Sequence, residues 1–272
     1  MNRTRLEIAA KTDPGCVRTN NEDNLAVVED LGLLVVCDGM GGHSSGEVAS
    51  QIAADTVKEF ALKMMGGPTQ LVPEGGDASR SARARQLEYF VKTANTMIFE
   101  KARAFPKDHG MGTTIVAALV DERSMTVAHV GDSRLYVLRN GALQQMTEDH
   151  SLVMDQVRRG LITLAEAEKS TIQNILTRAL GTEAEVVVDV QDHPLLAGDL
   201  LMLCSDGLTK HVAEADLART LREGKSANEL CDALIQKARD GGGSDNITVV
   251  VARVPGARSD GLLGRLSNIF HT

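Results

Sequence analysis

The sequence predicts an α+β fold in which antiparallel sheets are covered by pairs of helices. Short runs rich in Val, Leu and Ile, each bounded by turn residues, follow one another along the chain and indicate strands. Longer segments with apolar residues at helical spacing come in adjacent pairs instead of alternating with the strands. This order favours antiparallel sheets over a doubly wound parallel sheet.

The strands are expected where the apolar runs are densest. They cover residues 25–29, 33–37, 114–120, 125–130, 135–138, 186–190, 200–204 and 247–254. Asn140 and Gly141 both tolerate a positive φ, so they predict a tight hairpin turn. Residues 142–146 would then form the returning strand.

Helices are expected in two adjacent pairs, over residues 46–65, 81–104, 214–223 and 227–240. Residues 66–80 are rich in Gly and Pro and read as a connecting loop, whereas residues 147–174 are polar and predict short, irregular helices. The composition shifts at Pro255, so we expect one domain over residues 1–254 and a tail over residues 255–272.

The tail carries one apolar helical face, formed by Leu262, Leu263, Leu266, Ile269 and Phe270. A face of this kind can dock on the domain, bind a partner or touch a membrane. No segment approaches the ~18 uninterrupted apolar residues of a membrane span. The first residues also lack the apolar core of a signal peptide, so the predicted location is cytoplasmic.

Charge and cysteine spacing exclude several classes of function. The net charge is −8 with no Trp, which disfavours nucleic acid as a partner because phosphate backbones would be repelled and stacking platforms are few. Cys16, Cys37, Cys204 and Cys231 show no CxxC spacing and are expected to be reduced and structural.

Aspartates mark the ends of several predicted strands. Asp38 and Asp206 each follow an apolar run and precede a glycine, Asp132 follows Val130 and Gly131, and Asp245 precedes the last strand. Each could be an ordinary turn residue. Carboxylates gathered at strand ends, however, repel one another unless cations neutralise them, and all-oxygen ligands suit Mg²⁺ or Mn²⁺.

Short motifs recur in a familiar order from residue 5 to residue 254. They are residues 18–23 (RTNNED), 37–43 (CDGMGGH), 112–114 (GTT), 130–134 (VGDSR), 149–151 (DHS), 204–208 (CSDGL) and 245–248 (DNIT). The series resembles the bacterial branch of the metal-dependent protein phosphatases, the PP2C or PPM family. The resemblance implies a four-layer fold, with two antiparallel sheets flanked by helix pairs and a metal centre in a cleft at one end.

The resemblance also implies a set of ligands. Asp38 would bridge two metal ions, and Asp206 and Asp245 would complete the coordination of one of them. Glu22 and the Gly39 carbonyl would serve the other ion, partly through water.

Two further positions match the family. Asp132 and Asp206 correspond to the pair that holds a third, weaker metal in bacterial members. Arg18 corresponds to the arginine that binds the substrate phosphate, where a guanidinium can contact two oxygens at once. Without the neighbouring motif, Arg18 would be taken for a solvated surface residue.

The implied reaction is direct attack on phosphorus by a hydroxide that bridges two metal ions, without a covalent intermediate. A cysteine phosphatase would need Arg six residues after its Cys, yet His43 and Lys210 stand at that distance from Cys37 and Cys204. Met40 occupies the place where eukaryotic members carry a histidine proposed as general acid. His43 could protonate the leaving oxygen instead, or could simply hold the turn before the first helix.

Residues 147–174 would form a flap beside the active site that influences substrate choice. Asp149 and His150, at its start, are expected to cap a helix. Residues 169–173 differ from the usual bacterial pattern, which leaves the substrate preference open.

The sequence therefore predicts a Mn²⁺- or Mg²⁺-dependent phosphatase of phosphoserine and phosphothreonine on proteins, monomeric and opposing a bacterial Ser/Thr kinase. One alternative is a catalytically silent relative that binds phosphoproteins as a regulator, which would be expected to have lost some of the aspartates. A second alternative is a phosphatase of small phosphorylated metabolites, which the same metal centre would permit.

Overall fold

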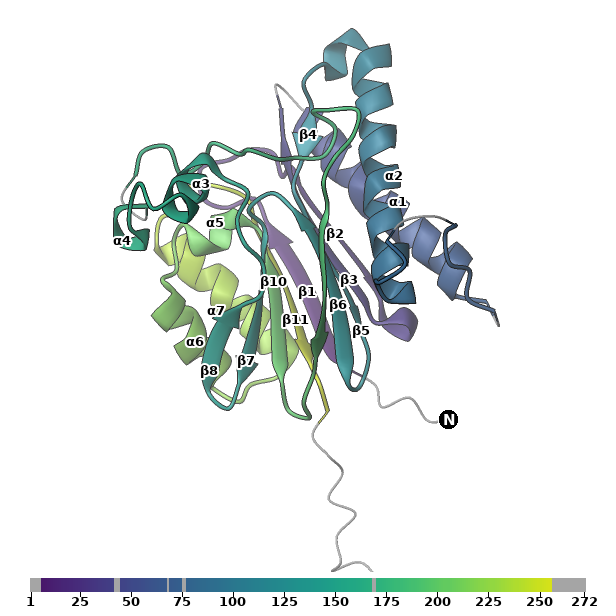
Figure 1. Ribbon diagram of the computed structural model, residues 1–272. Coiled ribbons are helices and arrows are strands. Elements are labelled where there is room, and N and C mark those ends of the chain that lie inside the picture. Colours follow the sequence, from purple (N-terminus) through teal and green to yellow (C-terminus); the bar gives the residue numbers. More distant parts are fainter. Residues whose placement is uncertain (1–5, 42–44, 68, 75–76, 168–169, 256–272) are drawn as a thin grey trace, which may run out of the picture.

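The fold is a sandwich of two antiparallel sheets with a helix pair on each outer face (Figure 1). The computed structural model describes residues 6–41, 45–67, 69–74, 77–167 and 170–255. The predicted α+β class and its four layers are confirmed. The strands lie side by side in the centre, and the helices cover them from the two sides.

The first sheet has the order β1, β11, β10, β7, β8, and the second has β2, β3, β5, β6, β9 with β4 paired to the end of β3. The first comprises β1 (Glu7–Asp13), β11 (Ile247–Arg253), β10 (Leu200–Cys204), β7 (Arg134–Arg139) and β8 (Ala142–Gln145). The second comprises β2 (Asp23–Val28), β3 (Leu33–Met40), β5 (Ile115–Val120), β6 (Ser124–Val130), β9 (Asp189–Pro194) and β4 (Gly112–Thr113).

Long helices in adjacent pairs cover the two sheets, as predicted. The pair α1 (Ser45–Met65) and α2 (Ala82–Ala104) packs on the second sheet, and the pair α6 (Glu214–Leu221) and α7 (Ala227–Asp240) packs on the first. Two short 3₁₀ helices, Glu29–Leu31 and Pro106–Asp108, lie in connections. No helix in the described part of the chain is long and apolar enough to cross a membrane.

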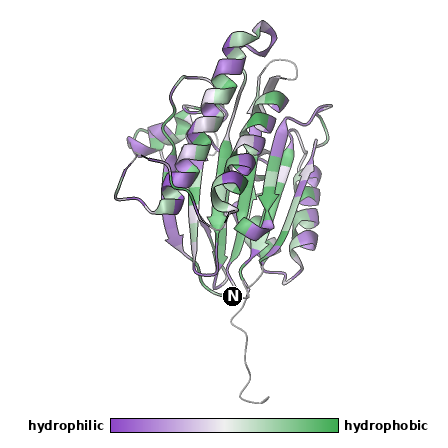
Figure 2. Cartoon of the chain, turned by 90° about the vertical axis from the view of Figure 1, so that its right-hand side faces the viewer, coloured by the Kyte–Doolittle hydropathy of each residue, from purple (hydrophilic) through white to green (hydrophobic). Residues whose placement is uncertain are grey.

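The central strands are apolar on both faces because both faces are covered. In β3, Leu34 and Val36 point between the sheets, whereas Leu33 and Val35 pack under α1 and α2. Such a strand reads as a continuous apolar run without alternation. Figure 2 shows the result, with hydrophobic strands inside and helices whose hydrophilic sides face outward.

β1 and β9 differ from the prediction, and the short strand β4 was not expected either. β1 was not expected, because its residues are only partly buried, and it forms along its whole length through pairing with β11, from Glu7 with Arg253 to Asp13 with Ile247. β9 runs over Asp189–Pro194 instead of residues 186–190, since pairing with β6 fixes an edge strand that is largely polar. The hairpin turn is confirmed, with φ of 51° at Asn140 and 78° at Gly141.

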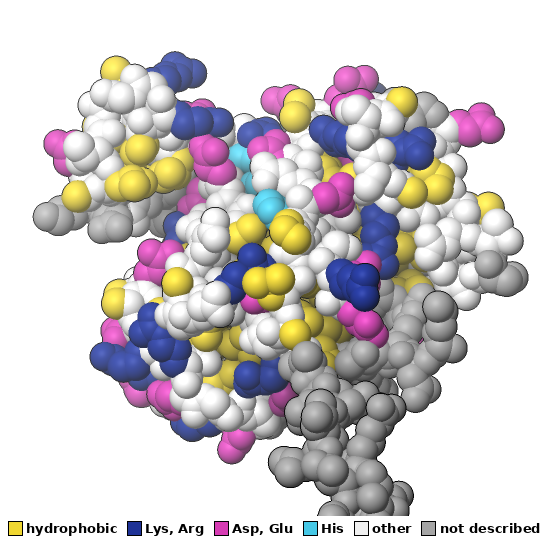
Figure 3. Space-filling model, turned by 60° about the horizontal axis from the view of Figure 1, so that its bottom comes forward, with side chains coloured by type: hydrophobic (Ala, Val, Ile, Leu, Met, Phe, Trp, Pro, Cys, Tyr) yellow, Lys and Arg dark blue, Asp and Glu magenta, His cyan; other side chains and the backbone are white. Residues whose placement is uncertain are grey.

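One end of the sandwich is covered by short helices. The polar segment expected to be irregular contains α3 (Leu152–Arg158) and α4 (Leu164–Ala167), and α5 (Asp206–Thr209) lies beside them in Figure 1. Figure 3 brings the opposite end forward, and the described basic and acidic side chains on that face are intermingled. That face therefore offers no single-sign surface of the kind that nucleic acid binds.

The chain beyond Pro255 lies outside the described residues, including the apolar face predicted for the tail. The last described backbone is firmly held, since Val254 N donates to Asp199 O at 2.9 Å and Val254 O accepts from Gly198 N at 3.1 Å. The domain boundary near residue 254 stays a prediction.

We expect a chain that ends at Pro255 to fold and to melt within about 4 °C of the full chain, because the described sheets are complete without residues 256–272. Calorimetry of the two proteins measures the difference. A fall of more than about 8 °C, well above what ~1 kcal/mol causes in a domain of this size, would place the tail in the core.

Candidate metal centre

The four predicted aspartates converge at the end of the sandwich that carries α5. Asp38 lies near the end of β3, Asp206 opens α5 directly after β10, and Asp245 precedes β11. Burial is the main cause that raises the pKa of Asp38 well above its usual range, and the charges of Asp206, Asp132 and Asp245 raise it further. Ligands from both sheets therefore meet at one place.

Asp132 and Glu22 belong to the same acidic group. Burial and the charges of Asp206 and Asp149 raise the pKa of Asp132 to about 7. Burial also raises the pKa of Glu22, and Asp245 adds to this effect while Arg18 opposes it. Carboxylates that are this reluctant to ionise in the protein alone are typical of a cation site.

Two buried carboxylate oxygens of this acidic group, Oδ1 of Asp206 and Oδ1 of Asp23, accept no hydrogen bond from any described residue. A buried oxygen without a partner is costly, and a bound cation would satisfy it. The donor set consists of carboxylates with the nearby Gly39 carbonyl, all oxygen. These residues fit Mg²⁺ or Mn²⁺.

The GTT motif holds the backbone of Asp38. Thr114 N and Thr113 Oγ1 both donate to the Asp38 carbonyl, at 2.8 and 2.9 Å. Asp38 N donates in return to Thr114 Oγ1 at 3.2 Å, and that hydroxyl lies 2.7 Å from Ser133 Oγ. The strand end that presents the Asp38 carboxylate is thus fixed from the neighbouring strand.

Asn246 ties the loop before β2 to the start of β11. Its Oδ1 accepts from Glu22 N at 2.8 Å, and its Nδ2 donates to the carbonyls of Pro14 and Asn20 at 3.1 and 2.8 Å. Glu22 is therefore held beside Asp245, although the two are far apart in the sequence. Asp245 of the DNIT motif was among the residues predicted for the site, whereas Asn246 was not.

Glycine is required at position 39 because three segments meet there. Gly39 N donates to Glu22 O at 3.1 Å, and a Cβ on Gly39 would lie 2.1 Å from Gly46 O. A Cβ on Gly46 would in turn lie 2.8 Å from Glu22 Oε2. The Glu22 carboxylate thus lies close to Gly39, as the predicted second ion requires.

Two cationic side chains contact the acidic group. The Arg18 guanidinium lies 3.1 Å from Asp245 Oδ1, and the Arg18 side chain is half exposed at the rim of the centre. Lys210 Nζ lies 2.5 Å from Asp206 Oδ2 and 3.1 Å from Asp245 Oδ2. The structure therefore brings Arg18 to the predicted place, and its contact with phosphate stays a prediction.

Asp23 is a member of the group that the sequence analysis did not single out. It pairs in register with Asp38 across β2 and β3, and it is almost fully buried. Ser205 Oγ donates to its Oδ2 at 2.7 Å, yet burial raises its pKa to about 7. The available signal was its place within the RTNNED motif, directly after Glu22.

Asp149 and His150 do not cap a helix, contrary to the prediction. Ser151 is the N-cap of α3, and its Oγ accepts from Met154 N. Asp149 instead accepts three hydrogen bonds from Arg134, the shortest at 2.6 Å, because a buried carboxylate needs a charged partner. Arg134 and Asp149 thereby join β7 to the start of the flap.

His150 belongs to a second group of possible ligands with His129 and Asp189, whose ligand atoms lie within 4.8 Å of one another. His150 Nδ1 already accepts from Gly131 N at 3.0 Å, and Arg178 donates to Asp189 at 2.6 Å. The polar atoms of this second group therefore have hydrogen-bond partners, unlike the two unsatisfied oxygens of the acidic centre. The group holds the loop before Asp132 against β9.

His43, the candidate general acid, lies outside the described residues, so its role stays a prediction.

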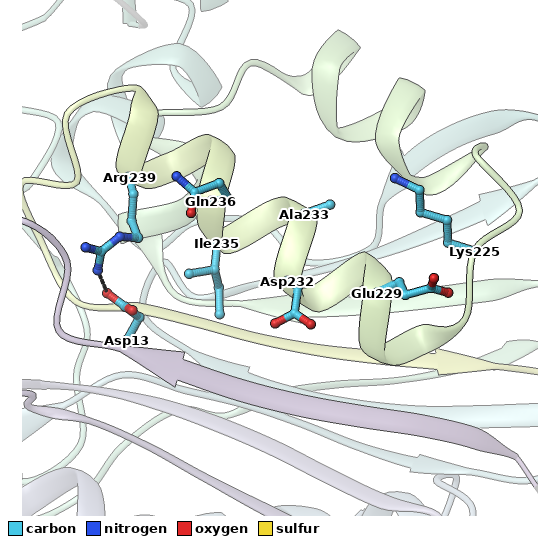
Figure 4. Close-up of a pocket in the computed structure, with 8 residues that line it drawn as sticks. All are labelled: Asp13, Lys225, Glu229, Asp232, Ala233, Ile235, Gln236 and Arg239. Carbon is cyan, nitrogen blue, oxygen red and sulfur yellow. Dashed lines mark hydrogen bonds and ion pairs between the residues drawn. The ribbon is translucent and has the colours of Figure 1, made fainter.

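A groove beside the centre is lined by Asp132, Asp206 and Lys210 and continues between the flap and α6. A different hollow follows α7 (Figure 4), where Asp13 is paired with Arg239 at 2.6 Å. Asp232 of that hollow is likewise paired, with Lys11.

Comparisons with known proteins agree on one family. Residues 17–245 match the family Protein phosphatase 2C. The serine/threonine phosphatase stp of Listeria innocua is 38% identical over 248 residues, which cover 89% of this chain and 93% of the relative.

Solved structures give the same result. The serine/threonine phosphatase PstP of Mycobacterium tuberculosis superposes with a TM-score of 0.81 at 35% identity, covering 92% of this chain and 99% of that one. A structure of the PstP catalytic domain in complex with two manganese ions gives a TM-score of 0.76 at 36% identity, covering 92% of this chain and 98% of that one.

The raised pKa values predict how pH acts on stability. Asp23 and Asp132 titrate near 7 in the fold, against about 4 in an unfolded chain, so the metal-free fold binds the extra protons between these values. Its stability therefore falls as pH rises through that range. Mn²⁺ bound to the ionised carboxylates would remove this loss.

We therefore expect the melting temperature with Mn²⁺, minus that with chelator, to increase from about pH 5.5 to about pH 7.5. His129 and His150, whose pKa values are lowered mainly by burial, act in the opposite direction, but equally in both samples. Differential scanning fluorimetry at matched ionic strength gives the difference, and a constant value across pH would contradict the expectation.

Proposed function

The chain belongs to the protein phosphatase 2C family, and from this premise we propose how it acts as a metal-dependent protein serine/threonine phosphatase. The observation that carries the proposal is the convergence of Asp38, Asp206 and Asp245, where the buried Asp206 Oδ1 accepts no hydrogen bond from any described residue. When bound there, Mn²⁺ or Mg²⁺ lowers the pKa of water and polarises the phosphoryl group.

Asp38 is proposed to hold both ions, because it lies within reach of the charges of four other aspartates, which are Asp23, Asp206, Asp132 and Asp245. Asp206 and Asp245 would complete the coordination of one ion, and Glu22 and the Gly39 carbonyl would be ligands of the second. Asp132 shares the acidic group with Asp206 and lines the groove, which supports its proposed role at a third ion.

Arg18 is proposed to hold the phosphate of the substrate. Its guanidinium reaches the rim of the centre and forms an ion pair there with Asp245. The remaining N–H groups can donate to two phosphate oxygens at once, which orients the phosphorus toward the attacking water. His43, three residues beyond Met40, is proposed to donate the proton to the leaving oxygen.

The substrates are phosphorylated proteins, and the groove between the flap and α6 is proposed to receive the peptide around the phosphorylated residue. We further propose that the protein acts as a monomer in the cytoplasm and opposes a Ser/Thr kinase. A silent regulator is disfavoured, because all four aspartates are present and converge.

Asp38→Asn tests the function. We expect Mn²⁺-dependent hydrolysis of phosphoserine and phosphothreonine peptides to fall by about two orders of magnitude, because the bridging charge is lost. Asp240→Asn, an exposed change of equal charge at the end of α7, should retain full activity. Release of phosphate with Mn²⁺, and again with chelator, is the measurement.

The same assay separates the alternatives. Turnover of small phosphorylated metabolites without turnover of phosphopeptides would identify a metabolite phosphatase. Binding of phosphopeptides with Mn²⁺ but without any turnover would identify a silent regulator.

Asp132→Ala tests the third ion. We expect kcat to fall about tenfold or more while two ions are retained and the melting temperature hardly changes, because Asp38, Asp206 and Asp245 remain intact. Metal stoichiometry, kcat and melting temperature are measured on one preparation. A lowered melting temperature with near-normal kcat would instead show that Asp132 is a structural turn residue and not a metal ligand.

A further inference from the structure

We propose that Lys210 competes with metal ions for Asp206 and Asp245, so that metal binding must displace its ammonium group into the adjoining groove. The inference rests on the proposed function, because it assigns these two carboxylates to the metal centre. It concerns how tightly this chain holds its metals and what the centre contains before they arrive.

The ammonium of Lys210 bridges the two carboxylates. Its Nζ lies 2.5 Å from Asp206 Oδ2 and 3.1 Å from Asp245 Oδ2, two oxygens from residues that flank the neighbouring strands β10 and β11. An ammonium at these distances occupies lone pairs that a metal ion would need. It also repels a divalent cation at short range.

The local backbone keeps Lys210 within reach. Lys210 directly follows α5, and its backbone N donates to Asp206 O at 2.8 Å, which places the two side chains one helical turn apart. The Lys210 side chain is 25% exposed, so the pair is partly shielded from solvent. The contact is therefore built into the fold and does not depend on a mobile surface residue.

The groove gives the displaced ammonium a destination. Lys210 lines it together with Asp132 and Glu214. A flexible four-carbon side chain can turn from the centre toward the groove while its backbone stays fixed. Metal binding would thus replace the ammonium of Lys210 at the centre with the metal ion. The displaced ammonium would add a positive charge to the groove.

Arg18 is a weaker competitor by the same criteria. Among the described residues its one ion pair is with Asp245, at Oδ1, and its side chain is 53% exposed against 25% for that of Lys210. Solvent screens an exposed pair more strongly than a buried one. Lys210 is the cation that both reaches two ligands and is shielded.

Lys210→Gln should change metal affinity and metal-free stability in opposite directions. Removal of the competing charge should tighten Mn²⁺ binding at the tightest sites about tenfold, a typical effect of a close charge pair. The metal-free variant should melt at a lower temperature than the metal-free wild type, because Asp206 and Asp245 lose the cation between them. A residue with a merely structural role would lower stability without tightening metal binding.

The experiment is isothermal titration of Mn²⁺ into the metal-free full chain, with melting curves in chelator and in saturating Mn²⁺. The variants are Lys210→Gln, Lys210→Arg, which keeps the charge, and Lys11→Gln. Lys11 pairs with Asp232 outside the centre, so Lys11→Gln removes an equal charge from the protein. We expect Lys210→Arg and Lys11→Gln to bind Mn²⁺ within about twofold of wild type.

Unchanged or weaker Mn²⁺ binding by Lys210→Gln would overturn the inference, and so would equal tightening by Lys11→Gln. If wild type binds Mn²⁺ normally in either case, the proposed function stands and only the role of Lys210 is wrong. Failure of the wild type to bind Mn²⁺ at all would overturn both.

Discussion

The mutual repulsion of buried carboxylates at one end of the sandwich is the constraint on which the rest of the structure depends. Burial raises the pKa values of Asp23, Asp38 and Asp132, and the charge of Asp206 raises all three further. A protein without bound cations would relieve this by moving the loops apart. Here the loops are held in place by hydroxyl and amide groups, so the negative potential is retained for an ion.

The two sheets supply the rigidity that this arrangement needs. Three separate apolar clusters fill the space between the sheets and the space under each helix pair. Asp38 is carried by one sheet, while Asp206 and Asp245 flank strands of the other. An ion bound among them would therefore join the two halves of the sandwich, and a small shift of one sheet against the other would change its coordination.

The sequence was informative where a local pattern is sufficient. The continuous apolar runs of β3 and β10 and the helical spacing of α1 and α2 predicted those elements closely, and the strand-end aspartates predicted the acidic group. β1 could not be predicted, because its partner β11 lies at the other end of the chain. Asp149 and His150 were misread for a related reason: Arg134 and Gly131, which determine their roles, become neighbours only in the folded protein. Asp23 was overlooked because its importance comes from its register with Asp38.

The pairing of β1 with β11 has a consequence for the order of events during synthesis. Glu7 and Arg253 are partners, so the first described strand has no place in a sheet until almost the whole described chain has left the ribosome. Asp245 precedes the same last strand, and Asn246 beside it fixes the loop that carries Glu22. An unfinished chain can therefore assemble the helical layer over β3 and β5 but cannot complete the acidic centre. A chain that stops before Asp245 lacks both this carboxylate and the strand that pairs with β1.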